Sequence, residues 1–123
     1  MISVLNGQDI DCISGHLTST KADLMEIKNW SKVLNRAGKE FPYLNSLKSM
    51  IGHCLGASGA IESIAAVLEL YHNFVHPNLN CNDLQSQITS LVDQVQIPAW
   101  ACEELNRGLA LPMLASGFPW VSR

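Results

Sequence analysis

The feature that most constrains the fold is a segment with three glycines, spaced four and three residues apart, that leads directly into a long helical pattern. Gly52, Gly56 and Gly59 precede apolar residues that recur at three- and four-residue steps. This spacing predicts an amphipathic helix from residue 57 or 58 to residue 72, ended by Pro77, with its apolar stripe turned towards a core. The stripe consists of Ile61, Ile64, Ala65, Leu68 and Tyr71. Small residues at a helix start are typical of close packing against a strand, or of amides directed at a ligand.

Composition places this helix within one globular domain. The chain has 123 residues, of which 47% are hydrophobic, so residues 1–123 are expected to form a single unit. Eight basic residues are scattered among eleven acidic ones, for a net charge of −3, which argues against a surface for nucleic acid. Glu62 and Glu69 interrupt the most apolar stretch, so it falls short of the roughly 20 apolar residues that span a membrane. The first nine residues lack the features of a secretory signal, and we expect a cytoplasmic protein.

Two short segments predict strands, and polar residues follow each of them. Residues 9–13 alternate polar and apolar side chains and run into a turn at Gly15, while residues 43–44 are a second apolar segment that leads into the loop before Gly52. Strands that alternate with helices are typical of an α/β sheet with helices on its faces. Two or three strands make an incomplete sheet, which is expected to need edge partners from elsewhere.

A further helix is predicted between these strands. Thr20, with Asp23 three positions later, resembles a capping box, so the helix is expected to begin near Lys21 and to stop at Gly38. Its apolar positions are Leu24, Ile27, Trp30, Val33 and Leu34. Farther along, residues 84–95 have the spacing of an amphipathic helix, whereas residues 89–97 are rich enough in β-branched side chains to include a strand. Both alternatives stay open.

Histidines are the first candidates for chemistry, because their side chains exchange protons near neutral pH. His16 and His53 each follow a predicted strand, and neighbouring parallel strands would bring both to one edge of the sheet. Lys48 and Glu26 are placed to supply charged partners for such a pair.

Two other kinds of site have little support. Glu69, His72 and His76 contain one Glu-x-x-His element, whereas dinuclear carboxylate bundles use two, so no metal is expected. The cysteines are Cys12, Cys54, Cys81 and Cys102. They contain no C-x-x-C pair, and the apolar fraction is high, which favours reduced thiols over a disulfide framework.

Two segments resemble the β-ketoacyl-acyl carrier protein synthases. Residues 45–62 read Asn-Ser-Leu-Lys-Ser-Met-Ile-Gly-His-Cys-Leu-Gly-Ala-Ser-Gly-Ala-Ile-Glu, which is similar to that family's Asn-Ser-x-Lys-Ser-x-x-Gly-His-x-x-Gly-Ala-x-Gly signature. Residues 13–20 look like its Ala-His-Gly-Thr-x-Thr segment, with Leu17 in place of the glycine. The resemblance covers about residues 9–81. It implies an α/β fold, the C-terminal half of a thiolase-like fold, present as a single partial domain with an incomplete mixed sheet and packed helices.

The resemblance also implies an activity and roles for four residues. Family members condense an acyl chain held on a cysteine with malonyl-acyl carrier protein, with loss of carbon dioxide, in fatty-acid elongation. His16 and His53 fall on the two histidines that hold the malonyl thioester oxygen and stabilise the enolate. Lys48 falls on the family lysine, and Glu26 on the glutamate that pairs with it.

Substrate binding and partners follow from the same resemblance. Thr18 and Thr20 fall where family threonines hydrogen-bond the pantetheine arm, so acyl carrier protein is the expected partner and no cofactor beyond its phosphopantetheine is expected. Complete members are homodimers. The acylated cysteine belongs to the family's N-terminal half and matches none of the cysteines here, so we expect the isolated chain to be inactive. Residues 115–118 only approximate the family's Ser-Phe-Gly-Phe-Gly-Gly loop, and the last strand is expected to be missing.

The alternative is a non-catalytic module that binds carrier protein or pantetheine, or that serves assembly. His16, Lys48 and His53 favour the fragment of a condensing acyltransferase, because a scaffold has no chemical need for all three.

Overall fold

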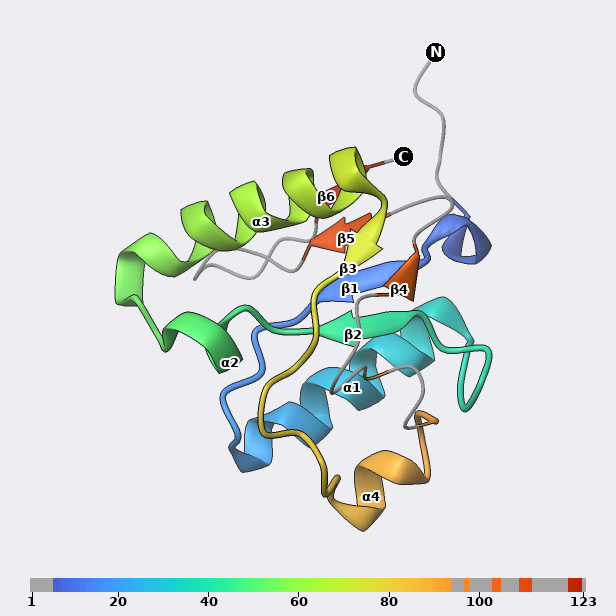
Figure 1. The fold of residues 1–123 in the computed structure, drawn as a ribbon. Coiled ribbons are helices and arrows are strands. Elements are labelled where there is room, and N and C mark those ends of the chain that lie inside the picture. Colours follow the sequence, from blue (N-terminus) through green and yellow to red (C-terminus); the bar gives the residue numbers. More distant parts are fainter. Residues whose placement is uncertain (1–5, 94–96, 98–102, 105–108, 112–119, 123) are drawn as a thin grey trace.

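A computed structural model of the chain describes residues 6–93, 97, 103–104, 109–111 and 120–122 (Figure 1). The strands are β1 (Cys12–Ser14), β2 (Tyr43–Asn45), β3 (Phe74–Val75), β4 (Glu103–Glu104), β5 (Leu109–Leu111) and β6 (Trp120–Ser122). The α-helices are α1 (Lys21–Leu34), α2 (Lys48–Ile51), α3 (Ser58–His72) and α4 (Ser86–Thr89), with 3₁₀ turns η1 (Gly7–Asp9) and η2 (Leu55–Ala57). No helix in these ranges is long and apolar enough to cross a bilayer.

The main sheet is mixed, in the order β2-β1-β5-β6. Strand β1 runs parallel to both β2 and β5, whereas β6 pairs with β5 in the antiparallel sense. Helix α3 covers one face of this sheet and α1 the other (Figure 1). The α/β class with an incomplete mixed sheet and packed helices is therefore confirmed. The expectation that a final strand is missing is wrong, since β6 follows β5 at the sheet edge.

Alternation along the strands divides the core into two clusters. Ile13 and Leu44 belong to the larger cluster, which includes Ile27 and Leu34 of α1. Cys12 faces the other way and packs with Ala66 of α3. Successive strand residues point to opposite faces, so one three-residue strand serves both helices.

Helix α1 begins where the sequence predicts but ends earlier. The Thr20 hydroxyl accepts a hydrogen bond from the backbone N–H of Ala22 and so caps the first turn. The helix stops after Leu34 because Asn35 adopts a left-handed conformation with φ of 53°, and this stop lies three residues before the predicted one at Gly38. Val33, predicted to face the core, is exposed.

Helix α3 has the predicted bounds, but a different face of it packs on the sheet. Its buried positions are Ser58, Gly59, Glu62, Ala66 and Glu69. Three members of the predicted core stripe, Ile64, Leu68 and Tyr71, are instead exposed. The helix ends at left-handed Asn73 rather than at Pro77. Periodicity failed here because the buried carboxylates have polar partners on other elements, which the spacing of apolar residues does not register.

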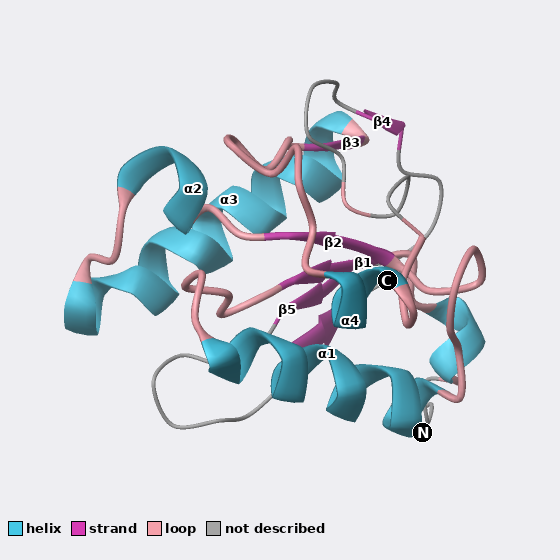
Figure 2. Ribbon diagram, turned by 90° about the horizontal axis from the view of Figure 1, so that it is seen from below, coloured by secondary structure: helices cyan, strands magenta, loops and turns pink. Residues whose placement is uncertain are grey.

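Two smaller predictions have definite outcomes. The loop expected before Gly52 contains the one-turn helix α2. In the segment for which both alternatives were open, α4 is helical and lies beside α1 (Figure 2), and Val92 forms an isolated parallel bridge with Gly38. Residues 94–96 lie outside the described residues. The loop at residues 115–118 lies outside the described residues.

Candidate active site

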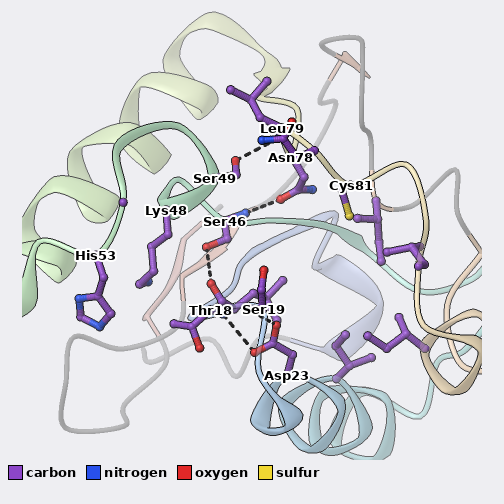
Figure 3. Close-up of a pocket in the computed structure, with 17 residues that line it drawn as sticks. Thr18, Ser19, Asp23, Ser46, Lys48, Ser49, His53, Asn78, Leu79 and Cys81 are labelled. Atoms are coloured by element: carbon purple, nitrogen blue, oxygen red, sulfur yellow. Dashed lines mark hydrogen bonds between the residues drawn. The ribbon is translucent and has the colours of Figure 1, made fainter.

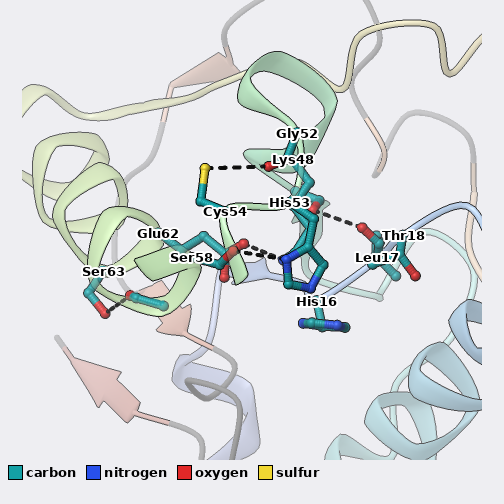
Figure 4. Close-up of polar contacts among 12 residues, drawn as sticks. His16, Leu17, Thr18, Lys48, Gly52, His53, Cys54, Ser58, Glu62 and Ser63 are labelled. Carbon is teal, nitrogen blue, oxygen red and sulfur yellow. Dashed lines mark hydrogen bonds and ion pairs between the residues drawn. The ribbon is translucent and has the colours of Figure 1, made fainter. Parts of the chain in front are cut away.

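His16 and His53 meet at the carboxyl edge of β1 and β2. The two strands are parallel and in register, with Ser14 opposite Asn45, and the Gly15 amide donates to the Asn45 carbonyl oxygen over 2.6 Å. The imidazole rings lie edge to face with centroids 5.4 Å apart, and both side chains are exposed (Figure 4). The prediction that parallel strands bring these histidines together is confirmed.

A strained loop directs a backbone amide at His53. Leu55 adopts a left-handed conformation with φ of 49°, which costs a residue with a side chain about 1–2 kcal/mol. Its backbone N–H donates to His53 Nδ1 over 2.9 Å, and the Ser58 hydroxyl lies 3.2 Å from the same nitrogen. A backbone N–H can only donate, so Nδ1 carries no proton and the neutral ring holds its proton on Nε2.

Lys48 forms a buried ion pair with Glu62. The Nζ group donates to Glu62 Oε1, and the two side chains are 6% and 7% exposed. This corrects the predicted pairing of Lys48 with Glu26. The sequence alone did not identify Glu62 as a site residue. Its signal is that Glu62 shares one helical face with the small residues Ser58 and Ala66, and a glutamate is rarely buried in such a face without a polar partner.

Glu26 instead holds the backbone that carries His16. Its Oε1 accepts a hydrogen bond of 2.9 Å from the His16 N–H. Burial raises the pKa of Glu26, and the hydrogen bond from His16 opposes that rise. Glu26 therefore acts on the position of the His16 main chain, across the turn between β1 and α1.

Thr18 and Thr20 belong to one hydrogen-bonded loop. Their hydroxyls share a hydrogen bond of 3.2 Å, and the Asp23 carboxylate accepts from the amides of Thr18 and Ser19 over 3.1 and 2.9 Å. Asp23 thus turns towards the loop before the cap instead of closing a reciprocal capping box with the Thr20 amide. Thr18 lines a pocket, while Thr20 mainly serves the helix start.

Leu17, the departure from the family pattern, has a packing role. Its side chain lies over Gly15, where an added Cβ would stand 2.9 Å from Leu17 Cγ. The Leu17 carbonyl oxygen accepts from the Ser46 hydroxyl over 3.2 Å. The loop that carries His16 is therefore tied to the end of β2.

A pocket of about 440 Å³ opens beside Lys48 and His53 (Figure 3). Its apolar lining includes Ile27, Leu84, Ile88 and Ile97, and its polar lining includes Thr18, Asp23, Ser46, Ser49 and Asn78. The side-chain amide of Asn78 connects the segment after β3 to the end of β2. Its Oδ1 accepts from the Ser46 N–H over 2.8 Å, and its Nδ2 donates to the Leu44 carbonyl oxygen over 2.9 Å. The site thus combines imidazoles, a buried cation and an adjoining cavity.

The remaining histidines and cysteines lie apart from this arrangement. His76 is buried with its Nε2 3.7 Å from Glu69 Oε1, while His72 is exposed beside Tyr71. The residues with described side chains contain no group of three or more potential metal ligands. Three cysteines, Cys12, Cys54 and Cys81, are free thiols, and Cys102 lies outside the described residues. The Cys54 side chain points away from His53 (Figure 4).

Comparison with protein families and curated sequences points to one group. A family model for the β-ketoacyl synthase C-terminal domain matches residues 3–82. A 3-oxoacyl-[acyl-carrier-protein] synthase 2 of Vibrio harveyi is 39% identical over 80 residues, which are 64% of this chain and 19% of the relative. A chloroplastic 3-oxoacyl-[acyl-carrier-protein] synthase I of Arabidopsis thaliana is 43% identical over 75 residues, or 59% of this chain and 15% of the relative. The chain spans about one-fifth of the length of these relatives, or less.

Solved structures agree with the sequence relatives. The ishigamide ketosynthase/chain length factor superposes with a TM-score of 0.74 at 28% identity, over 94% of this chain and 27% of that one. A ketosynthase bound to a hexaketide, in complex with its type II PKS acyl-carrier protein, gives a TM-score of 0.67 at 27% identity, over 86% and 25% of the two chains. These likenesses confirm the expected thiolase-like fold.

Proposed function

This chain belongs to the β-ketoacyl synthase family through its C-terminal domain, and from that premise we propose that it supplies the decarboxylation site of a condensing enzyme. In this reaction the bond between the malonyl carboxylate and the adjacent carbon breaks, carbon dioxide leaves, and the electron pair forms a thioester enolate. The enolate carbon attacks an acyl thioester on a cysteine and expels the thiolate. The product is a β-ketoacyl thioester two carbons longer.

The observation that supports this role is the pair of imidazoles at one sheet edge. His53 carries its proton on Nε2 because Nδ1 accepts from the Leu55 amide, and the His16 ring lies 5.4 Å away, centroid to centroid. In our proposal both rings bind the malonyl thioester oxygen, and the Nε2–H of His53 donates to it. Charge on that oxygen grows as carbon dioxide leaves, so such donors stabilise the transition state more than the ground state.

Lys48 and Glu26 act around these histidines. We propose that Lys48, neutralised by Glu62, sets the electrostatic field near His53, and that Glu26 positions His16 through its main chain. The ammonium end of this ion pair favours negative charge that develops on its side of the site, because low polarity strengthens the attraction between them. The site uses no cofactor other than the phosphopantetheine that carries the substrate.

The loop with Thr18 and Thr20 is the proposed contact for the pantetheine arm. Thr18 lines the pocket beside Lys48 and His53, and the two hydroxyls already share a hydrogen bond, so they present a small polar wall to an amide-containing arm. The partner is then acyl carrier protein, which is also present in one structurally similar complex. The names of the curated relatives favour fatty-acid elongation as the setting.

We also propose that residues 1–123 are a single partial domain that acts with a separate cysteine-bearing portion, in an assembly that is homodimeric when complete. Cys12 is fully buried, and burial followed by the nearby Glu69 charge raises the pKa of its thiol, which disfavours the thiolate needed for attack. Cys54 faces away from His53. In this proposal neither thiol is the acylated nucleophile, and the isolated chain gives no condensation.

The test is reconstitution with the N-terminal portion of a related synthase such as that of Vibrio harveyi. We expect the mixture to release carbon dioxide from carboxyl-labelled malonyl-acyl carrier protein, and the chain alone to give no condensation product. His53→Ala or His16→Ala should lower release about 10²–10³-fold, whereas His72→Ala, on the exposed end of α3, should not change it.

Two outcomes would contradict the proposal. Sustained condensation by the chain alone would show that it contains its own nucleophile. Pantetheine-dependent carrier-protein binding that survives replacement of both His16 and His53 by alanine, in a mixture without turnover, would instead support a non-catalytic binding module.

A further inference from the structure

Ser58 contacts the imidazole of His53 from the start of helix α3. It is the first residue of that helix and is 6% exposed. Its hydroxyl oxygen lies 3.2 Å from His53 Nδ1 (Figure 4). The position before it, Ala57, makes no side-chain cap, so the first polar side chain of the helix is directed to a histidine and not to helix amides.

The direction of this hydrogen bond follows from a second contact. The Leu55 backbone N–H donates to the same Nδ1 over 2.9 Å, and a backbone N–H has no alternative role. Because Nδ1 is therefore an acceptor, the Ser58 hydroxyl donates as well. The two donors then share the single lone pair of Nδ1, and the ring proton stays on Nε2.

The two donors come from elements that differ in burial. Leu55 is 78% exposed and belongs to a short 3₁₀ turn with a left-handed backbone. Ser58 is buried at the end of a fifteen-residue helix that packs on the sheet. The imidazole is therefore held by a backbone donor from an exposed turn and by a side-chain donor from a buried helix start, so Ser58 ties the ring to helix α3.

We propose that Ser58 is a positioning residue for His53, and that its hydroxyl holds the imidazole in the Nε2–H tautomer with that proton presented beside His16. The inference about tautomer and orientation rests on geometry alone. Its use in decarboxylation rests on the proposed function. Groups that orient metal-binding histidines through the other ring nitrogen typically change affinity or activity 10–100-fold when removed, and we expect an effect of the same size here.

The tautomer can be measured on the 123-residue chain itself. Two-bond proton–nitrogen correlations of the His53 ring distinguish the two tautomers and report hydrogen bonding at Nδ1. We expect wild type to show the Nε2–H form with Nδ1 strongly hydrogen-bonded. Ser58→Ala should move the Nδ1 resonance towards that of an unbonded ring nitrogen and increase exchange broadening, while Ser58→Thr should restore the wild-type signals.

Ser63 provides a matched control on the same helix. Its hydroxyl donates to the Gly59 carbonyl oxygen over 2.7 Å, so Ser63→Ala removes an equivalent group and should leave the His53 signals unchanged. Backbone amide spectra identify any variant that fails to fold, and Ser58→Thr then carries the test. A wild-type Nδ1–H tautomer, or identical Nδ1 resonances in wild type and folded Ser58→Ala, would overturn the inference.

Activity measurements separate this inference from the proposed function. In the reconstituted enzyme, Ser58→Ala should lower kcat 10–100-fold with KM unchanged, because the contact lies behind the ring and away from the substrate. If wild type shows no turnover in any mixture but Ser58→Ala still shifts Nδ1, the proposed function fails and the positioning role stands. Full activity of Ser58→Ala would contradict the positioning role while leaving the proposed function in place.

Discussion

Two glutamates on one helix show how single residues meet the cost of burial in different ways. Glu62 is neutralised by the buried ammonium group of Lys48. Glu69 is 1% exposed and takes uncharged donors, from Asn45 Nδ2 over 2.6 Å and from the His76 amide over 2.8 Å. A buried carboxylate requires either a charged partner or a proton. The contribution of Glu62 to stability therefore depends on Lys48, and that of Glu69 depends on pH.

Removal of Lys48 should be strongly destabilising. Lys48→Met leaves the Glu62 carboxylate buried without its partner, which typically costs about 3–5 kcal/mol. Urea unfolding should show this loss, and the double variant Lys48→Met/Glu62→Leu should recover most of it because no unpaired charge remains. Lys28→Met, an exposed position on α1, is the matched control. Equal stability of wild type and Lys48→Met would contradict the ion pair.

Glu69 should make stability fall as pH rises. Burial raises the pKa of Glu69 above its value in the unfolded chain, although the hydrogen bond from His76 opposes that rise. The folded state therefore holds the proton more tightly, and this contribution is complete below the unfolded pKa, about 4.3, and is lost as pH rises through the raised folded pKa.

Glu69→Gln tests this pH dependence because glutamine keeps an acceptor oxygen and does not titrate. Unfolding free energies measured from pH 4 upward should favour the variant over wild type increasingly as pH rises through this window. Asp83→Asn removes an equal charge at an exposed position and should follow wild type. A constant difference between Glu69→Gln and wild type across the range would exclude titration of Glu69 as the cause.

At the scale of elements, helix α3 exposes the side that its periodicity predicts to be buried. Ile64 is 62% exposed and Tyr71 is 79% exposed, whereas Ala66 is fully buried against Cys12 and Val75. Small residues let the helix approach the sheet closely, and the acids on the same side carry their own partners. Among the three glycines, Gly59 is buried in α3, whereas a Cβ added at Gly52 or Gly56 would meet nothing within 4 Å. Close packing at the helix start is therefore limited to Gly59, and the predicted apolar stripe is not the face that packs.

Two substitutions on α3 distinguish these orientations. Ile64→Ala should change the unfolding free energy of the chain by no more than about 0.5 kcal/mol, as at a surface, instead of the roughly 2–5 kcal/mol expected in a core. Ala66→Leu should cost about 1–3 kcal/mol, because added methylenes have no room against the sheet. Urea midpoints measure both. A large loss from Ile64→Ala with a neutral Ala66→Leu would show that the helix is turned the other way.

At the scale of the molecule, the exposed face of α3 and the short length of the chain relative to its relatives both favour a contact between this face and another polypeptide segment. Ile64, Val67, Leu68 and Tyr71 form an apolar surface on one helix, and clusters of this kind are typical of contact sites. The chain spans about one-fifth of the length of its curated relatives. We expect the remainder of a synthase to cover this surface.

Reconstitution offers a direct check on that surface. Val67→Asp, at a position 60% exposed, should leave the stability of the isolated chain nearly unchanged and should weaken association with the N-terminal portion of the synthase by several kcal/mol, since it buries a charge without a partner. Met25→Asp, on α1 at 67% exposure, is the matched control. Titration calorimetry that gives the same affinity for both variants would place the contact elsewhere.

Local chemistry in the sequence determined much of the site. The Thr20 cap, the bounds of α3 and the meeting of His16 with His53 depend on short-range patterns and on the general geometry of parallel strands, so they were predictable. The stop at Asn35 was not, because asparagine adopts the left-handed conformation only in some contexts. The helix end was predicted at Gly38 because glycine often ends helices, but Gly38 instead forms an isolated β-bridge with Val92.

By itself the sequence determined the α/β class, the first two strands with the helix between them, the long helix α3 and the residues that gather at the sheet edge, since these depend on periodicity, capping and motif spacing. Only the tertiary structure decided that Lys48 pairs with Glu62 while Glu26 holds His16, and that α3 turns its acids inward. The physical reason is that a buried charge chooses its partner by distance in three dimensions. Helical spacing fixes which residues share a face of α3. Which face is buried depends on polar partners on other elements, such as Lys48 for Glu62 and Asn45 for Glu69.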